Sequence, residues 1–264
     1  MATASKAKGP AQLFDLTGRV AIVTGSTKGI GRAMVQGLAE AGASVVVSSR
    51  KQELCDQVAR EVTAATGASA LGLACHVGEW EQIPAFVDEV HRRLGRIDVL
   101  VNNAGINPAH VSPTEMTLEY WRKLFSVNLE GPLRLSQLVA PIMRGQGGGS
   151  IINIATMAAY SGGARICAYG ASKAALVNLT KSMAQEVASW KVRVNILAPG
   201  PFQSEMVEGV ERNQPGFKQM IADGTYQRRV AEPEEIVGPV LYLASDASSF
   251  VTGDEISVSG GMQK

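Results

Sequence analysis

Short apolar runs rich in valine and isoleucine recur along the chain, with longer stretches of helical spacing between them. The apolar runs cover residues 20–24, 44–49, 69–75, 97–103, 150–156, 193–199 and 255–260. The helical stretches cover residues 30–42, 52–66, 79–95, 115–143, 166–190 and 233–245. Continuous apolar runs indicate strands covered on both faces, and their alternation with helices indicates βαβ units. The pattern predicts an α/β fold: a Rossmann-type, doubly wound parallel sheet of about seven strands with helices on both faces.

The chain has the size and composition of one large α/β domain. Apolar residues make up 45% of its 264 residues, which is enough for a sizeable core. Residues 1–13 are small, polar and slightly basic, so we predict a disordered tail before a catalytic domain over 14–264. The stretch 201–230 is the least regular, and a loop of that length inside a domain predicts a substrate lid.

Charge and cysteine usage exclude several classes of protein. A formal net charge of +1 argues against nucleic acid or an acidic membrane as the main partner. The apolar runs fall short of the roughly 20 residues that a membrane span needs. Cys55, Cys75 and Cys167 lie far apart without metal-ligand spacing, which is typical of reduced cysteines in the cytoplasm. We therefore predict a cytoplasmic protein without a metal site, acting on a small molecule.

A glycine-rich loop follows the first predicted strand. Its spacing is G-x3-G-x-G, which differs from the dinucleotide fingerprint G-x-G-x-x-G. Gly25 permits a tight exit from the strand, Gly31 allows close packing of helix on strand, and the helix start offers N–H groups to a pyrophosphate. Glycines also end strands for steric reasons alone, but the position before an amphipathic helix favours a nucleotide site. The predicted cofactor contacts in this loop are Gly25, Thr27, Lys28, Gly29, Ile30 and Gly31.

The end of the second predicted strand indicates which nucleotide binds. NAD-binding proteins keep an acidic residue there for the ribose 2′-hydroxyl, yet no acidic residue occurs over 43–52. Ser49 and Arg50 stand at that point, and Lys28 lies in the glycine loop. A guanidinium and an ammonium suit a 2′-phosphate, so we predict NADP(H). Arg50 as the start of a solvated helix is the alternative, and NAD(H) stays open with it.

Four motifs occur in a fixed order along the chain. The glycine loop is followed by NNAG (102–105), NLEG (128–131) and YGASK (169–173). Together they resemble the short-chain dehydrogenase/reductase family, and the resemblance covers essentially all of 16–261. It is nearest to the NADPH-dependent carbonyl reductase-like members, and it implies a homotetramer acting on a ketone or secondary alcohol.

The resemblance assigns catalytic roles to four residues. Tyr169 and Lys173 share a helix face, and the ammonium together with the positive nicotinamide is expected to lower the pKa of the phenol. Tyr169 is then the general acid in reduction and the base in oxidation. Asn128 holds a helix kink in this family, with a helix-capping role as the alternative. The family serine 13 residues before the tyrosine is Thr156 here, and we predict that its hydroxyl does the same work; a misaimed hydroxyl and a slow or inactive enzyme are the alternative.

Further contacts follow from the same resemblance. Beyond the glycine loop, the implied cofactor contacts are Ser49, Arg50, His76, Val77, Asn103, Ala104, Gly105, Tyr169, Lys173, Pro199, Gly200, Phe202 and Ser204. The implied substrate contacts are Ile106, Asn107, Met157, Tyr160 and Met206. For His76 an ordinary surface histidine is an equal reading. The small or apolar character of the substrate set favours a compound with an apolar body.

Two other functions fit the same motifs. The 3-oxoacyl-[acyl-carrier-protein] reductases share them, and a basic patch beside the cleft would favour that activity. A non-catalytic nucleotide-binding member of the fold is the second alternative, and Thr156 is the feature that supports it.

Overall fold

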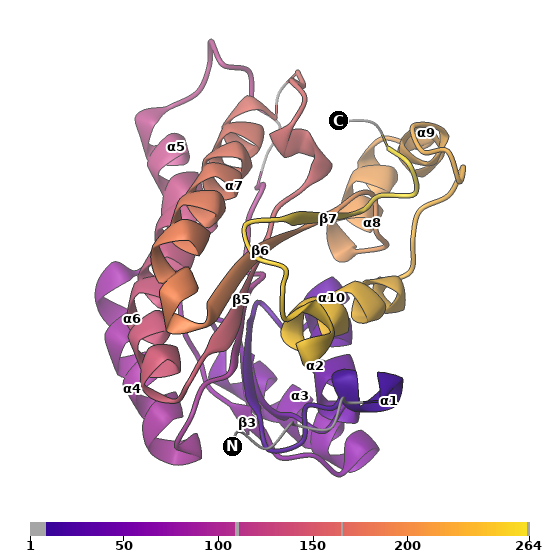
Figure 1. Cartoon of the computed structure of the whole chain (residues 1–264). Helices are drawn as coiled ribbons and strands as arrows, with labels where there is room; N and C mark the ends of the chain where they lie inside the picture. The colour runs from indigo at the N-terminus through magenta and orange to yellow at the C-terminus, as the bar shows by residue number, and fades with distance from the viewer. Residues whose placement is uncertain (1–8, 109–110, 165, 263–264) are drawn as a thin grey trace, which may run out of the picture.

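The computed structural model describes residues 9–108, 111–164 and 166–262, which form a three-layer α/β sandwich (Figure 1). One seven-stranded parallel sheet lies in the middle, in the order β3-β2-β1-β4-β5-β6-β7. The predicted doubly wound fold is therefore confirmed. The strands are β1 (Val20–Thr24), β2 (Ser44–Ser48), β3 (Ala70–Gly72), β4 (Val99–Asn102), β5 (Gly149–Ile154), β6 (Val192–Pro199) and β7 (Glu255–Val258).

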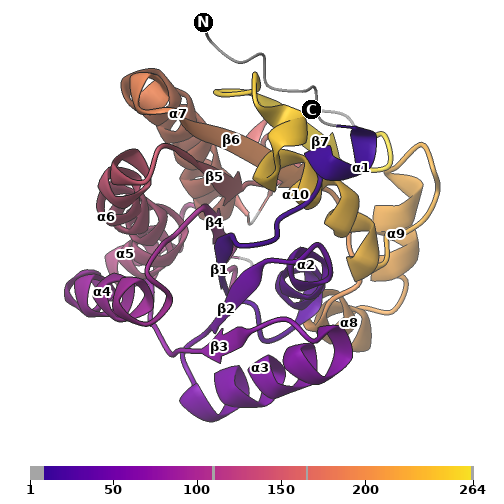
Figure 2. The same cartoon turned by 60° about the horizontal axis from the view of Figure 1, so that its bottom comes forward.

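Helices cover both faces of the sheet (Figure 2). α2, α3 and α10 lie on one face, and α4, α5, α6 and α7 lie on the other. The helices are α1 (Pro10–Leu13), α2 (Gly29–Glu40), α3 (Gln52–Thr66), α4 (Ile83–Leu94), α5 (Leu118–Phe125), α6 (Gly131–Gly145), α7 (Cys167–Val187), α8 (Glu205–Asn213), α9 (Phe217–Asp223) and α10 (Val237–Ala244). Among the residues described, no helix combines the length and the apolarity that crossing a membrane requires.

The sheet separates two apolar cores, and this explains the continuous apolar runs. Ala21 and Val23 of β1 point into a core with Met34 of α2, while Ile22 points to the other side, where it joins Phe86 of α4. Every residue of β1 is buried, as the pattern of a strand covered on both faces requires. Each such side chain contributes about 1.5–3 kcal/mol on full burial.

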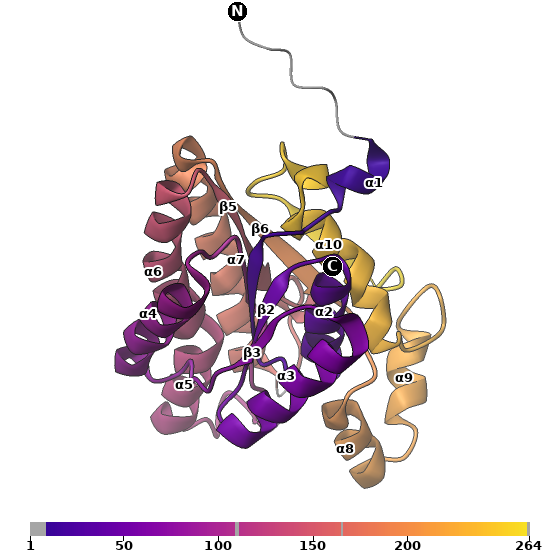
Figure 3. The same ribbon diagram turned by 90° about the horizontal axis from the view of Figure 1, so that it is seen from below.

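Three segments differ from what the sequence pattern predicts. The single helix predicted over 115–143 is α5 and α6, joined by a π-helical turn at Ser126–Glu130. The irregular lid predicted over 201–230 contains two helices, α8 and α9, which stand out beside α2 and α3 (Figure 3). Of the predicted tail, residues 1–8 lie outside the described residues, and Pro10–Leu13 forms α1.

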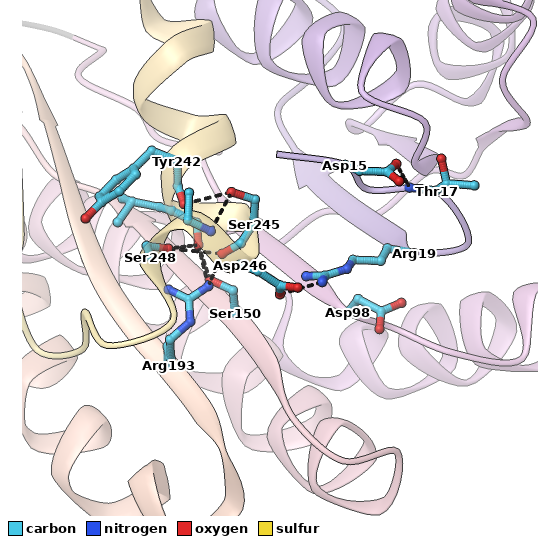
Figure 4. A network of polar contacts seen from close by, with 12 residues as sticks. Asp15, Thr17, Arg19, Asp98, Ser150, Arg193, Tyr242, Ser245, Asp246 and Ser248 are labelled. Atoms are coloured by element: carbon cyan, nitrogen blue, oxygen red, sulfur yellow. Dashed lines mark hydrogen bonds and ion pairs between the residues drawn. The ribbon is translucent and has the colours of Figure 1, made fainter. Parts of the chain in front are cut away.

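Polar contacts fasten the amino-terminal end of the sheet to α10 (Figure 4). The Arg193 guanidinium on β6 donates to the carbonyl oxygens of Leu243 (2.7 Å) and Ser245 (3.2 Å), where α10 ends. A cation at a helix C-terminus is stabilised by the helix dipole. Burial is the main reason that the pKa of Arg193 falls to about 10, and the nearby Arg19 charge adds to it. This end of the sheet is stabilised by structural contacts, whereas the motifs gather at the carboxyl end.

Candidate active site

The glycine loop makes a close backbone turn at the end of β1. Gly25 has φ +65°, a left-handed conformation that favours glycine. A Cβ on Gly31 would lie 2.5 Å from Asn103 Nδ2 and closer still to the Gly25 carbonyl oxygen, so only glycine fits there. Lys28 is the N-cap of α2 and its side chain makes no capping bond. The first N–H groups of α2 are thus not capped by the Lys28 side chain, which suits the pyrophosphate of a dinucleotide.

The NNAG motif at the end of β4 holds the glycine loop through hydrogen bonds. Asn103 Nδ2 donates to the carbonyl oxygens of Thr24 (2.8 Å) and Gly25 (3.1 Å). In return, Thr24 Oγ1 accepts the N–H groups of Asn103 and Ala104, both at 3.0 Å. The Asn103 side chain therefore shapes the predicted cofactor loop from within. Thr24, which sequence reasoning missed, is the second half of this lock.

Asn128 lies in the π-helical turn between α5 and α6 and is fully buried. Its Oδ1 accepts the Ile106 N–H (2.8 Å), and its Nδ2 donates to the Ile106 carbonyl (3.0 Å). Its Nδ2 also donates to Ser172 Oγ (3.2 Å), which in turn donates to the Tyr169 carbonyl (2.8 Å). π-turns inside helices are frequent at functional sites. The irregularity that the family resemblance implies at Asn128 is present, and it ties the loop after β4 to α7.

Thr156, Tyr169 and Lys173 meet at the carboxyl end of β5. Tyr169 and Lys173 lie one turn apart near the start of α7, and the Thr156 hydroxyl is near enough to Tyr169 to act on the pKa of its phenol. Lys173 is only 3% exposed, and its Nζ donates to the Ile154 carbonyl at 2.8 Å. A Cβ on Gly105 would lie 3.4 Å from both Lys173 Nζ and Asn128 Oδ1. The structure therefore brings the four predicted catalytic residues into one cluster.

The pKa of Tyr169 corrects one expectation. It is raised above the ordinary value of tyrosine, chiefly by burial, and the hydrogen bond with Thr156 opposes the rise. Burial also lowers the pKa of Lys173 to about 8. Burial therefore sets the direction of the shift, which is opposite to the lowering expected from the ammonium and the bound nicotinamide together. In this environment Tyr169 is a protonated phenol at neutral pH, which is the form that an acid catalyst needs.

The residues predicted to hold a 2′-phosphate differ in the partners that they already have. Arg50 is exposed, and no ion pair of it is found within the described ranges. The Lys28 ammonium, in contrast, forms an ion pair with Glu205 at the start of α8. The Ser49 N–H and hydroxyl both contact Cys55 Sγ, at 3.1 and 3.4 Å. Arg50 is the group most open to an anion at this end of β2.

Several predicted cofactor residues have structural contacts of their own. His76 Nδ1 accepts the N–H of Gly78 (3.2 Å) and closes a local turn. Phe202 is buried in the core and bridges to Ala231. Ser204 Oγ accepts the Val207 N–H (3.2 Å) as the N-cap of α8. Among the other predicted contacts, Val77 lies in the core. Pro199 is the last residue of β6, and Gly200 follows it and packs on Ser259.

Several predicted substrate residues also have structural contacts of their own. Met157 is buried among Ala155, Val177 and other apolar side chains, and its contact with a substrate stays a prediction. The Tyr160 hydroxyl donates a hydrogen bond to the Glu255 carboxylate on β7, and the residue borders a cavity of about 330 Å³. Asn107 Oδ1 is buried and has no hydrogen-bond partner among the described residues. The side chain of Met206 lies outside the described part of the chain.

The described side chains can be compared with the donor sets that metal ions need. No group of three or more histidine, cysteine, aspartate or glutamate residues that could hold an ion occurs among them. The chemical groups at the site are a phenol, an ammonium, a hydroxyl and amides.

Comparisons with known proteins agree with this geometry. A family model described as enoyl-(acyl carrier protein) reductase matches residues 25–263. Dehydrogenase/reductase SDR family member 4 of Homo sapiens is 39% identical over 249 residues, covering 93% of this chain and 88% of that protein. A gluconate 5-dehydrogenase from Burkholderia cenocepacia, solved with NADP and tartrate, is 36% identical with a TM-score of 0.91; the match covers 96% of this chain and 98% of that one. L-Sorbose reductase from Gluconobacter frateurii, solved with NADPH and L-sorbose, is 31% identical with a TM-score of 0.90, over 96% and 99% of the two chains.

Proposed function

The chain belongs to the short-chain dehydrogenase/reductase family of oxidoreductases, and on that premise we propose that it transfers a hydride between NADP(H) and a ketone or secondary alcohol. The observation that carries the proposal is the cluster at the end of β5. There the Thr156 hydroxyl acts on the pKa of the Tyr169 phenol, and Lys173 lies one turn further along α7. A carbonyl oxygen at this point would meet two hydroxyl groups.

The proposed mechanism assigns proton transfer to the protein. The bound nicotinamide supplies hydride to the carbonyl carbon in reduction and accepts it in oxidation. In reduction, Tyr169 Oη gives its proton to the carbonyl oxygen, while the Thr156 hydroxyl holds that oxygen in place. The buried Lys173 ammonium stabilises the resulting phenolate and returns a proton toward it. Asn128 holds the loop after β4 through Ile106, and it contacts α7 through Ser172, so it fixes the loop relative to the helix.

The glycine loop and β2 support NADP(H) as the cofactor. The uncapped start of α2 suits the pyrophosphate, and Arg50 is free to pair with a 2′-phosphate. The Burkholderia and Gluconobacter structures hold NADP and NADPH, respectively. NAD(H) is the alternative cofactor.

The side chains near the site and the solved relatives bear on the class of the substrate. A carbonyl reductase acting on a small ketone fits the apolar Ile106 beside the site. The solved relatives named above act on sugar acids or ketoses by their names, so a hydroxylated ketone belongs in the same tests.

We further propose a cytoplasmic homotetramer. Large apolar side chains on α5 support an assembly, since Leu118 is 60% exposed and Trp121, stacked on Phe125, is 37% exposed. Sedimentation of the purified chain would test the assembly, and a monomer would contradict it.

An activity panel tests the enzymatic proposal. Protein, NADPH or NADH, and a series of ketones, hydroxyketones and 3-oxoacyl thioesters are mixed while absorbance at 340 nm is followed, with the reverse reaction run on alcohols. Turnover of ketones with a higher kcat/KM for NADPH is expected. Cofactor binding without turnover of any member would favour the non-catalytic alternative, and preference for NADH would contradict the NADP(H) assignment.

The Thr156 hydroxyl is expected to be required for turnover. Thr156→Val keeps the shape but removes the hydroxyl that lowers the Tyr169 pKa and would hold the carbonyl oxygen, so kcat should fall by about 10²-fold, the lower range for a positioned catalytic group. Thr156→Ser keeps the hydroxyl and should stay within about tenfold of the original chain. Steady-state kinetics of the two variants measure this. A valine variant that retains most of kcat would show that no hydroxyl is needed.

The pH dependence of reduction is expected to follow Lys173. Its pKa of about 8 means that the ammonium is present below pH 8 and is lost as the pH rises through that value. Since the ammonium stabilises the phenolate formed on proton donation, kcat for reduction should decline above about pH 8. Lys173→Arg keeps a positive charge at all these pH values, so its lower activity should show no such decline. An identical descending limb in both proteins would contradict the assignment.

A further inference from the structure

One ion pair joins the glycine loop to the segment after β6. Lys28 Nζ contacts Glu205 Oε2, although the two residues are 177 positions apart in the sequence. Lys28 is the N-cap of α2, and Glu205 is the first residue of α8. Their side chains are 67% and 72% exposed, so both can exchange partners with a ligand from solvent.

Glu205 and the next glutamate along the same helix have ion-pair partners in different parts of the molecule. Glu208 pairs with Lys218 of α9 at 2.7 Å, within the α8–α9 unit. None of the described side chains of α8 is buried. Among the described residues, Glu205 supplies the ion pair that reaches from α8 to Lys28.

We propose that Glu205 is a specificity-determining residue, which competes with the 2′-phosphate of the cofactor for the Lys28 ammonium. The inference rests on the proposed use of NADP(H), for which Lys28 and Arg50 are the two predicted phosphate ligands. Arg50 is open to an anion, whereas Lys28 already has a carboxylate partner. A 2′-phosphorylated nucleotide must displace Glu205 to gain its second cation. A nucleotide with a free 2′-hydroxyl leaves the Lys28–Glu205 pair intact.

The size of the effect follows from the exposure of the pair. Exposed ion pairs are weak because water and salt screen both charges. Removing the carboxylate should therefore tighten binding of a 2′-phosphorylated nucleotide by roughly two- to fivefold at low ionic strength. Binding of nucleotides without that phosphate should stay unchanged, and added salt should reduce the difference.

Calorimetric titration with 2′,5′-ADP and 5′-AMP tests the inference. Glu205→Gln should lower the Kd for 2′,5′-ADP two- to fivefold and leave the Kd for 5′-AMP unchanged. Glu208→Gln is the matched control, since it removes the same charge from the same helix but from a pair with Lys218. Tightening of 2′,5′-ADP binding in Glu205→Gln that Glu208→Gln does not share supports the proposal. An unchanged Kd in Glu205→Gln, or an equal effect in both variants, overturns it.

A second background separates direct competition from a general electrostatic effect. In Lys28→Met the added Glu205→Gln change should have no further effect on the Kd for 2′,5′-ADP, and a persisting effect would overturn the competition. The NADP(H) assignment is judged separately by the original chain. If 2′,5′-ADP binds no more tightly than 5′-AMP, and Arg50→Met does not weaken it, that assignment and the role of Glu205 both fail. If the phosphate preference holds and Glu205→Gln is neutral, the role of Glu205 alone fails.

Discussion

Replacing Tyr169 by phenylalanine is expected to reduce kcat for ketone reduction by about 10²–10⁴-fold, the usual contribution of a positioned acid–base group. The change removes only the phenolic oxygen, whose ionised form is favoured by Thr156. The aromatic ring and its packing on α7 remain. The pKa of Tyr169 is raised by burial, so the proton that this oxygen carries is present throughout the neutral range. Stopped-flow or steady-state rates with NADPH and the best ketone of the panel measure the loss.

A matched control uses another partly buried tyrosine. Tyr242 lies on α10, which covers the opposite face of the sheet from α7, and its backbone carbonyl rather than its hydroxyl takes part in the contacts there (Figure 4). Tyr242→Phe should therefore keep kcat within about threefold, as most substitutions away from the site do. Both variants should bind NADPH as the original chain does. A Tyr169→Phe variant that keeps more than a tenth of the original kcat would rule out its role as the acid.

The order of strands and helices could be predicted because burial on both faces leaves a mark in the sequence. The run VAIVT has no polar alternation, since α2 and α10 pack on one side of it and α4 and α6 pack on the other. The run over 69–75 gave only the short strand Ala70–Gly72, because β3 is the sheet edge and pairs with β2 alone. A pattern of apolar residues cannot show where a strand stops pairing.

Two features of the backbone left no such mark. The π-turn at Ser126–Glu130 adds a residue to one helical turn, and apolar periodicity over 115–143 is too coarse to detect it. In the segment 201–230, Gly209 and Gly216 suggested a loop, yet Ser204 caps α8 and Gly216 has φ +93° where α9 begins. Two short helices with few buried side chains resemble a loop in their sequence pattern.

The spacing of Tyr169 and Lys173 predicted their shared helix face, but not the sign of the pKa shift of the phenol. That sign depends on how much water the fold excludes, which spacing does not contain. Thr24 and Ser172 were missed for a related reason. Their hydroxyls bond groups that lie elsewhere on the chain or in the helix backbone, so a small polar residue gains its role only from tertiary contacts.

Replacing Gly31 by alanine is expected to weaken nucleotide binding and to destabilise the fold. A Cβ there would lie 2.5 Å from Asn103 Nδ2 and nearer to the Gly25 carbonyl oxygen, and backbone on this side cannot move without opening the lock between β1 and β4. Overpacking of this kind costs about 1–3 kcal/mol. Because the displaced groups form the predicted phosphate loop, the Kd for NADPH should rise at least about tenfold. Thermal or urea unfolding and fluorescence titration measure the two effects.

The opposite outcome is expected at a glycine with the same secondary structure and free space. Gly238 also lies in a helix, α10, and a Cβ there would meet no atom within 4 Å. Alanine is the better helix former by about 0.8–1 kcal/mol, so Gly238→Ala should be neutral or stabilising and should leave NADPH binding unchanged. Helix propensity favours alanine at both positions, so a loss confined to Gly31→Ala can come only from the contact with the loop. If the two variants behaved alike, the close approach of α2 to Gly25 would not be what holds the nucleotide loop in shape.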